Sequence, residues 1–177
     1  MQKIKMMVLA CAASGLTACG GAAGYQSLDA GLPGATIQLN KSYGGTGAGS
    51  AANQFYAFAH DEDCDSSQMA ASFTWTTGDQ ASLRVPADQP IIVWAATVYL
   101  QTTGVSMVNG NPAPNVGQNG CFNNLQFTPR DGHTYDVRQA STRTSGECAL
   151  QIVDLGTHAP PPDLQLQKYE KCREAEG

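Results

Sequence analysis

Apolar and polar residues alternate in short runs along most of the chain. Ala35, Ile37 and Leu39 alternate with Thr36 and Gln38, which is the period-2 pattern of a strand with one buried face. The same alternation recurs further along, in the segments 71–76, 83–85, 134–138 and 148–152. The pattern therefore predicts a chain built from short, half-buried strands.

Two segments are apolar on both sides of the predicted strand. Residues 55–59 are aromatic or small apolar at every position, and residues 91–100 are almost entirely apolar and rich in β-branched side chains. Such runs are typical of strands that are covered on both faces. We therefore expect residues 91–100 to form a central strand, followed by shorter runs at 105–108 and 122–127.

The spacing of these runs predicts an all-β fold. About eight short strands follow one another at hairpin-like intervals, without a long helical period and without alternation of strands and helices. An antiparallel β-sandwich is the simplest arrangement of such strands. Asp163 follows three prolines and is predicted to cap a short C-terminal helix that ends at Cys172.

One local motif points to a particular kind of sandwich. Tyr135 follows an Asp131-Gly132 turn at the start of a strand. This resembles the tyrosine corner of immunoglobulin-like and transthyretin-like sandwiches, in which the hydroxyl bonds to the preceding loop. The alternative is a tyrosine that only points into the core, and both interpretations favour the same fold.

The first 18 residues form a leader. Lys3 and Lys5 precede an apolar run at 6–13, which is too short to span a bilayer as a helix. The leader ends in Leu16-Thr17-Ala18-Cys19, which resembles the lipobox of bacterial lipoprotein precursors. The resemblance implies cleavage before Cys19 and acylation of Cys19 with several chains, which anchor a protein stably. An ordinary cleaved signal peptide is the alternative.

The resemblance also implies a location and a domain plan. Gly20 follows the lipidated cysteine in place of the Asp of inner-membrane retention signals, so we expect the outer membrane of a diderm bacterium. The Gly/Ala-rich segment 19–33 is predicted to be a flexible tether. Residues 34–158 then form the sandwich domain, and residues 159–177 form a Pro-rich tail with the short helix.

The charge balance excludes some partners. The chain has a formal net charge of −5, and loss of the two leader lysines leaves 8 basic and 15 acidic residues, a net charge of −7. An acidic protein is not expected to bind nucleic acid or anionic lipid surfaces.

The cysteines predict two disulfides. Cys11 leaves with the leader, and the four cysteines beyond the lipid site are 57, 27 and 24 residues apart, too far for a paired metal motif; they are Cys64, Cys121, Cys148 and Cys172. In an exported protein an even set is read as a disulfide framework, with three possible connectivities. We favour Cys64–Cys121 with Cys148–Cys172, because the second bridge would tie down the tail.

No catalytic or metal-binding motif stands out. Asp61, Asp63 and Asp65 alternate as at the start of a calcium loop, but Ser66 and Ser72 replace the expected Gly and Glu, so a solvated loop is favoured.

The three histidines also lie far apart in the sequence, at His60, His133 and His158. No hydrolase elbow, zinc-protease motif or phosphate-binding loop is present. We therefore predict a protein that is not an enzyme and that binds neither a metal nor a cofactor.

Two long segments without periodicity, 43–53 and 109–120, are the best candidates for function. The second is rich in uncharged hydrogen-bonding residues and is the candidate interaction loop, with Asn109, Asn111, Pro112, Pro114, Asn115, Gln118 and Asn119. Plain disorder is the alternative.

These features predict a non-catalytic lipoprotein of the outer membrane that binds a protein partner in the cell envelope, such as a secretion or envelope complex. Its plan of lipobox, tether and sandwich is similar to that of transthyretin-like secretion lipoproteins, although the extra cysteines depart from it. One alternative is an inhibitor or immunity lipoprotein whose rigid loop 109–120 enters the cleft of an envelope-targeting enzyme. Another is a carbohydrate-binding module, which would display Trp75, Trp94 or several tyrosines in a row on one sheet face.

Overall fold

The fold is all-β, as the sequence predicts. The computed structural model describes residues 24–42, 52–60, 67–74, 77–109, 111–141 and 148–166, and this part of the chain contains strands and turns but no helix. In chain order the strands are β1 (Gly34–Asn40), β2 (Ala52–Ala59), β3 (Gln68–Phe73), β4 (Gln80–Pro86), β5 (Ile91–Val108), β6 (Asn111–Phe127), β7 (Thr134–Ser141), β8 (Cys148–Asp154) and β9 (Gln165–Leu166). A helix long and apolar enough to cross a membrane is not found among the described residues.

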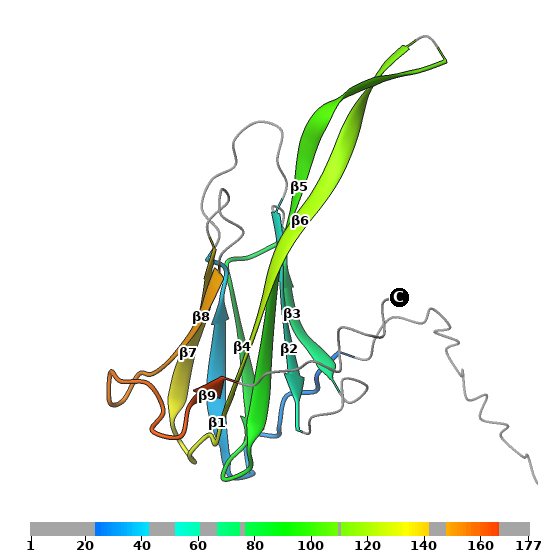
Figure 1. Cartoon of the computed structure of the whole chain (residues 1–177). Coiled ribbons are helices and arrows are strands. Elements are labelled where there is room, and N and C mark those ends of the chain that lie inside the picture. Colours follow the sequence, from blue (N-terminus) through cyan, green and yellow to red (C-terminus); the bar gives the residue numbers. More distant parts are fainter. Residues whose placement is uncertain are drawn as a thin grey trace, which may run out of the picture.

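The strands form two sheets (Figure 1). One has the order β4-β1-β7-β8 and the other has the order β3-β2-β5-β6-β9. Every pairing between these strands is antiparallel except that of β1 with β7, where Ile37 lies opposite Tyr135 in a parallel register. The expectation of a purely antiparallel fold is therefore wrong at this pair. Most of the chain separates β1 from β7, so no hairpin dictates their relative direction.

Both sheets contribute to one hydrophobic core. The four-stranded sheet supplies Ile37, Leu39, Val137 and Ile152, and the five-stranded sheet supplies Tyr56, Phe58, Val93 and Phe127, among others. The alternation predicted in β1 places alternate side chains inside. The long apolar run of β5 lies between β2 and β6, where Ile91, Ile92 and Val93 are all buried, so the central strand is confirmed.

The tyrosine corner is also present. Arg130 donates its backbone N–H to the Tyr135 hydroxyl over 3.0 Å. Gly132 adopts a φ of 73°, which the turn before β7 requires and which glycine adopts without strain. Asp131 Oδ1 accepts the backbone N–H of Gly34 at 2.7 Å, so the same turn holds the start of β1.

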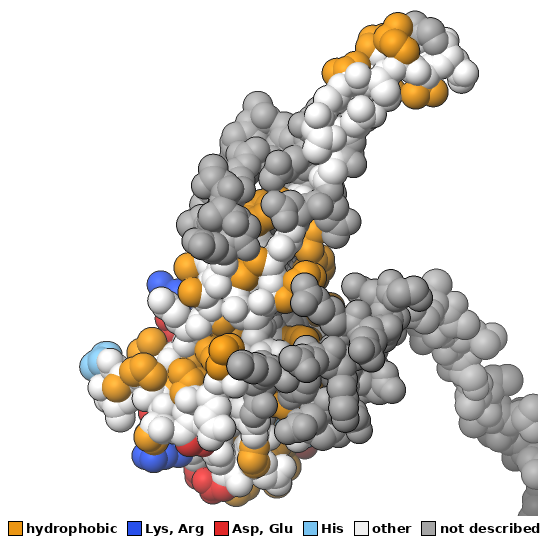
Figure 2. Space-filling view, viewed as in Figure 1, with side chains coloured by type: hydrophobic (Ala, Val, Ile, Leu, Met, Phe, Trp, Pro, Cys, Tyr) orange, Lys and Arg blue, Asp and Glu red, His pale blue; other side chains and the backbone are white. Residues whose placement is uncertain are grey.

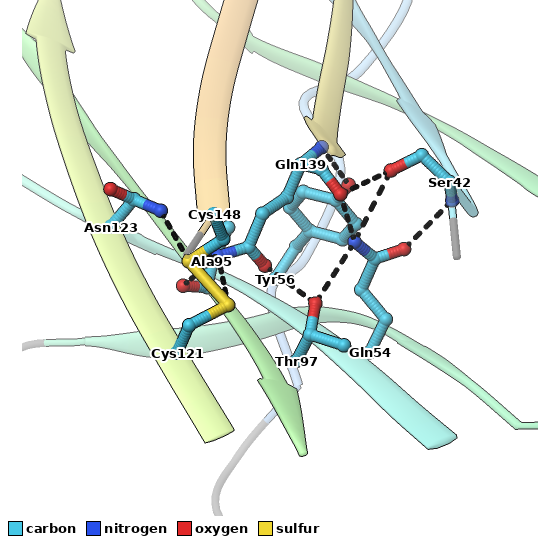
Figure 3. The surroundings of a disulfide bond; sticks show 9 residues. All are labelled: Ser42, Gln54, Tyr56, Ala95, Thr97, Cys121, Asn123, Gln139 and Cys148. Carbon is cyan, nitrogen blue, oxygen red and sulfur yellow. Dashed lines mark hydrogen bonds between the residues drawn. A yellow bond between two sulfur atoms is a disulfide. The ribbon is translucent and has the colours of Figure 1, made fainter. Parts of the chain in front are cut away.

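A polar cluster occupies one end of the core (Figure 3). Gln54, Thr97 and Gln139 are completely buried. Thr97 donates its hydroxyl to Gln139 Oε1 over 2.9 Å, and Gln139 Nε2 donates to the Ala95 carbonyl over 3.1 Å. The Gln54 amide donates to the Gln139 carbonyl over 3.1 Å, so the cluster joins the two sheets with hydrogen-bonded polar groups.

A disulfide lies beside this cluster and also joins the sheets. It connects Cys121 on β6 with Cys148 on β8, with 6.0 Å between their Cα atoms. The favoured pairings Cys64–Cys121 and Cys148–Cys172 are therefore both wrong. The bond is decided by where β6 and β8 meet across the core, which spacing along the chain does not reveal. Cys64 and Cys172 lie outside the described residues.

The predicted C-terminal helix is not found in the part of 163–172 that the structure describes. Asp163 Oδ2 instead accepts the backbone N–H of Thr128 over 2.9 Å. Gln165 and Leu166 then form β9 at the edge of β6. The Asp163 carboxylate thus accepts a backbone N–H just after the end of β6, and the residues that follow Asp163 add a short strand to the five-stranded sheet. Residues 167–177 lie outside the described residues.

The predicted tether is partly docked on the body. Tyr25 donates its backbone N–H to the Met69 carbonyl over 2.7 Å, and its ring packs edge-on against Phe58 at 5.0 Å between centroids. Leu28 donates its backbone N–H to the Arg84 carbonyl over 3.0 Å. The segment 24–32 thus passes from β3, at the edge of one sheet, to β4, at the edge of the other. The residues of 19–33 that precede Gly24 lie outside the described residues.

We expect the protein to lose stability between pH 10 and pH 12 through Tyr56. Its hydroxyl donates to the Asn40 carbonyl over 2.8 Å, and burial raises its pKa from 10.0 to about 12 even though the Gln139 N–H bonded to it acts in the opposite direction. The unfolded chain releases this proton near pH 10 while the native state still holds it, so stability present below pH 10 is lost as pH rises. Urea unfolding should show about 2–3 kcal/mol more loss over this range than in Tyr56→Phe. Equal losses in both proteins would contradict the assignment.

Candidate functional site

The most prominent feature of the surface is a two-stranded arm. β2 pairs with β5 as far as Ala52 opposite Tyr99, and beyond that point β5 and β6 continue together without a third strand among the described residues. This part, residues 100–118, is called the arm here; it projects past the end of the sheet (Figure 1). From Tyr99 to Val108 it spans about 30 Å at the usual rise of a strand.

The arm replaces the predicted interaction loop. Asn111, Pro112, Pro114, Asn115, Gln118 and Asn119 all belong to β6, and Asn109 lies in the turn at the tip. The described residues of 109–120 are therefore mostly strand, and they project from the body together with the end of β5 (Figure 1). The missed signal is the dipeptide Asn109-Gly110, the preferred sequence of a tight hairpin turn. Asn109 has a φ of 53°, as such a turn requires.

The tip of the arm has one apolar face and one mixed face, on which the exposed Val108 lies beside polar residues. Directly opposed residues of an antiparallel pair share a face, so Met107 and Pro112 lie on the same side as Val105. Val105 and Met107 are 66% and 69% exposed, and Pro112 is also exposed. On the other face Ser106 donates its hydroxyl to Asn115 Oδ1 over 2.8 Å. Figure 2 shows hydrophobic side chains gathered at this tip.

The two edges of the tip differ in their ability to pair with another strand. Pro112 and Pro114 lack an N–H group, so the ladder between β5 and β6 runs through the residues between them, such as Ala113 opposite Ser106. The backbone nitrogens of both prolines therefore point to the outer edge of β6, so that edge has no hydrogen-bond donor at these two positions. Proline at a strand edge prevents further strands from adding there. The tip is thus better suited to contact a partner through its side chains than to pair with a further strand along β6.

The arm is also free of charge. Residues 89–129, which contain all of β5 and β6, include no Asp, Glu, Lys, Arg or His. The charged groups of the protein therefore all lie outside these two strands. An uncharged, amphipathic arm can enter a desolvated site without burying an ion.

A second candidate is a surface recess around His133 and Asp154. His133 Nδ1 lies 2.7 Å from Asp154 Oδ2, and Gly156 donates its backbone N–H to Asp154 Oδ1 over 2.8 Å. Burial acts to raise the pKa of the Asp154 carboxyl, but these hydrogen bonds hold it below its ordinary value. Gln38 and Thr134 line the same recess.

The chemistry of the recess is limited. It contains one imidazole held by one carboxylate, and the lining includes neither serine nor cysteine. Among the described residues no group of three or more potential metal ligands comes together. Asp154, the last residue of β8, connects the turn before β7 to the turn after β8, because His133 and Gly156 both bond to it. This geometry fits a structural pair.

The side chains of the other two predicted histidines do not line this recess. His60 and His158 are exposed, and His158 lies in the turn after β8 with a φ of 56°. Cys19 and the weak calcium candidates Asp61, Asp63 and Asp65 lie outside the described residues.

The aromatic residues do not form an exposed row in the described part. Tyr56, Tyr99 and Tyr135 are buried, while Trp94 and Tyr25 are half-buried. Trp75 lies outside the described residues. The feature that would distinguish a carbohydrate-binding face is therefore absent from the surface that the structure describes.

Comparison with known proteins identifies no relative. No protein-family model, curated protein or solved structure matches this chain.

Proposed function

We propose that this protein is a non-catalytic lipoprotein of the bacterial outer membrane that uses the arm to bind a protein partner in the cell envelope. The observation that carries the proposal is the tip of the arm, where Val105, Met107 and Pro112 are exposed on one face about 20–26 Å beyond the end of β2. A contiguous exposed apolar patch on a protein surface marks an interaction site. The lipobox at Leu16-Thr17-Ala18-Cys19 supports the anchor.

We also propose that the two sheets form a β-sandwich of the immunoglobulin-like or transthyretin-like kind. The core shared by both sheets, the tyrosine corner at Tyr135 and the bond between Cys121 and Cys148 across the sheets support this arrangement. We propose Cys64 and Cys172 as the partners of a second disulfide, since they are the other two of the four cysteines beyond the lipid site.

An inhibitor of an envelope-targeting enzyme is a second candidate function. The observation that favours it is the blocked β6 edge, because a projecting ribbon with no donors at Pro112 and Pro114 fits a cleft better than a sheet edge. Both proposals place the contact at the tip of the arm. They differ in the partner, which is an envelope assembly in one case and a secreted enzyme in the other.

The test is site-specific photo-crosslinking in intact cells followed by affinity measurement. We expect a crosslinker at Met107 to form one discrete protein adduct, whereas a crosslinker at Leu166, which is 65% exposed on β9, forms none. With the identified partner, the pair Val105→Ser and Met107→Ser should weaken binding by about 100-fold or more, since each buried apolar side chain contributes about 1.5–3 kcal/mol.

Folding provides the control for this prediction. Val105 and Met107 are exposed, so their replacement should leave the melting temperature unchanged, and Leu166→Ser should leave both binding and melting unchanged. Adducts that form from the body but not from the arm would contradict the proposed binding site.

A further inference from the structure

We infer that the arm is held away from the membrane that anchors the chain, and that it enters an uncharged, apolar groove of a protein partner in the aqueous space beside that membrane. This inference rests on the proposed anchoring at Cys19. It adds the orientation of the molecule and the chemistry of the partner site. Both follow from where the N-terminal segment docks and from what the arm lacks.

The chain between the anchor at Cys19 and the docked residue Gly24 is short. Gly24 forms a bridge with Met69, and the backbone of Tyr25 bonds to the same residue, so the docked chain begins at Gly24. Only four residues separate Gly24 from Cys19. Even fully extended, this stretch of chain reaches at most about 18 Å. The docking point of Gly24 is therefore close to the lipid head groups.

The docking point is far from the tip of the arm. Met69 lies opposite Ala57, which in turn lies opposite Trp94, so Gly24 is at the level of Trp94 across the sheet. Fourteen residues of β5 lead from Trp94 to Val108, a distance of about 45 Å at the rise of a strand. The short anchor cannot bridge that distance. Figure 1 shows the arm at the opposite end of the molecule from the start of β1.

The charge of the body opposes the one orientation that would return the tip to the bilayer. The molecule would have to lie flat, which presses the side of the body against the head groups. The described residues carry seven acidic and four basic side chains, a net charge of −3, and an acidic surface is repelled by anionic lipid. The upright orientation places the tip in the aqueous space, so its partner is not the anchoring bilayer.

The chemistry of the tip specifies the partner site. A charged group of the partner, once covered by the arm, would be buried without a counter-ion, because residues 89–129 carry no charge. The face of Val105, Met107 and Pro112 requires an apolar surface. The opposite face, where Ser106 and Asn115 lie beside the exposed Val108, requires neutral hydrogen-bonding groups next to an apolar contact. A groove in a folded protein provides both within the width of a two-stranded ribbon.

The orientation can be measured by energy transfer to the membrane. The full chain is purified from bacterial membranes and reconstituted into vesicles whose head groups carry an acceptor dye. Donor dyes are placed on unnatural amino acids at Asn109, in the turn at the tip, or at Asp88, in the turn before β5 at the opposite end. We expect several-fold higher transfer from Asp88 than from Asn109. Equal or higher transfer from Asn109 would overturn the inference.

Palmitate labelling of the wild type and Cys19→Ala separates this outcome from failure of the proposed function. A labelled chain whose tip lies at the bilayer overturns the orientation alone. A chain that is not labelled overturns the proposed anchoring, and the orientation falls with it.

The groove is tested with charges of both signs at one position. Met107→Lys and Met107→Glu should each weaken binding to the crosslinked partner by a similar factor of 100-fold or more, with little dependence on salt. The same substitutions at Leu166 should have no effect. Tolerance of one sign but not of the other would show a charged groove and overturn the inference. Identification of the adduct as a second copy of this chain, or as lipid, would also overturn it.

Discussion

Replacing Cys121 and Cys148 together by alanine is expected to lower the free energy of unfolding by about 3.5 kcal/mol. The disulfide closes a loop of 27 residues, and restricting such a loop in the unfolded chain contributes stability of about this size. The bond also fixes β6 against β8 and thus one sheet against the other. The measurement is urea unfolding of the double variant and the wild type under non-reducing conditions.

Peptide mapping without reduction is the control for this prediction. The wild type should yield a fragment that joins Cys121 to Cys148, and the double variant should yield none. A fragment that joins Cys64 to Cys121 would contradict the connectivity and with it the expected loss.

Gln139→Ala is expected to destabilise the protein by about 3–5 kcal/mol. The Gln139 side chain is completely buried, and its loss removes a partner from the Thr97 hydroxyl and from the Ala95 carbonyl. Each buried group left without a partner costs about 1–3 kcal/mol, and the cavity adds to that cost. The free energy of unfolding in urea measures the effect.

Two further variants separate the causes. Gln139→Met keeps most of the volume but removes the hydrogen bonds, so it reports the polar part alone. Arg138→Ala changes the neighbouring residue, whose side chain is 59% exposed and pairs with Asp136, and should cost less than about 1 kcal/mol. Equal losses in Arg138→Ala and Gln139→Ala would show that the cluster is not the source of the stability.

Local patterns account for the parts of the fold that were predicted correctly. The alternation at Ala35, Ile37 and Leu39 places these residues on one side of β1, and the core lies on that side. The tyrosine corner follows in the same way, because Arg130 and Tyr135 are close in the sequence. Both features depend on residues within a few positions of one another.

The sequence pattern identified the segment that forms the candidate site but predicted the wrong conformation for it. The segment 109–120 was selected for its length and lack of charge, and it does form the projecting part of the molecule. Its prolines and asparagines disfavour strands in general, so the local preference favoured a loop. Pairing with β5 outweighs that preference, because Pro112 and Pro114 occupy positions where the ladder needs no donor.

By itself the sequence determined that this chain is all-β, which side chains of β1 alternate, and which turn precedes Tyr135. It also contains Leu16-Thr17-Ala18-Cys19, whose resemblance to a lipobox supports the proposed anchor at Cys19. These features are written in residues that are neighbours along the chain. Only the tertiary structure decided that β1 runs parallel to β7, that Cys121 bonds to Cys148 and that Gly24 docks at the level of Trp94. Each of these contacts joins residues far apart in the sequence, and whether they meet depends on the packing of the whole core.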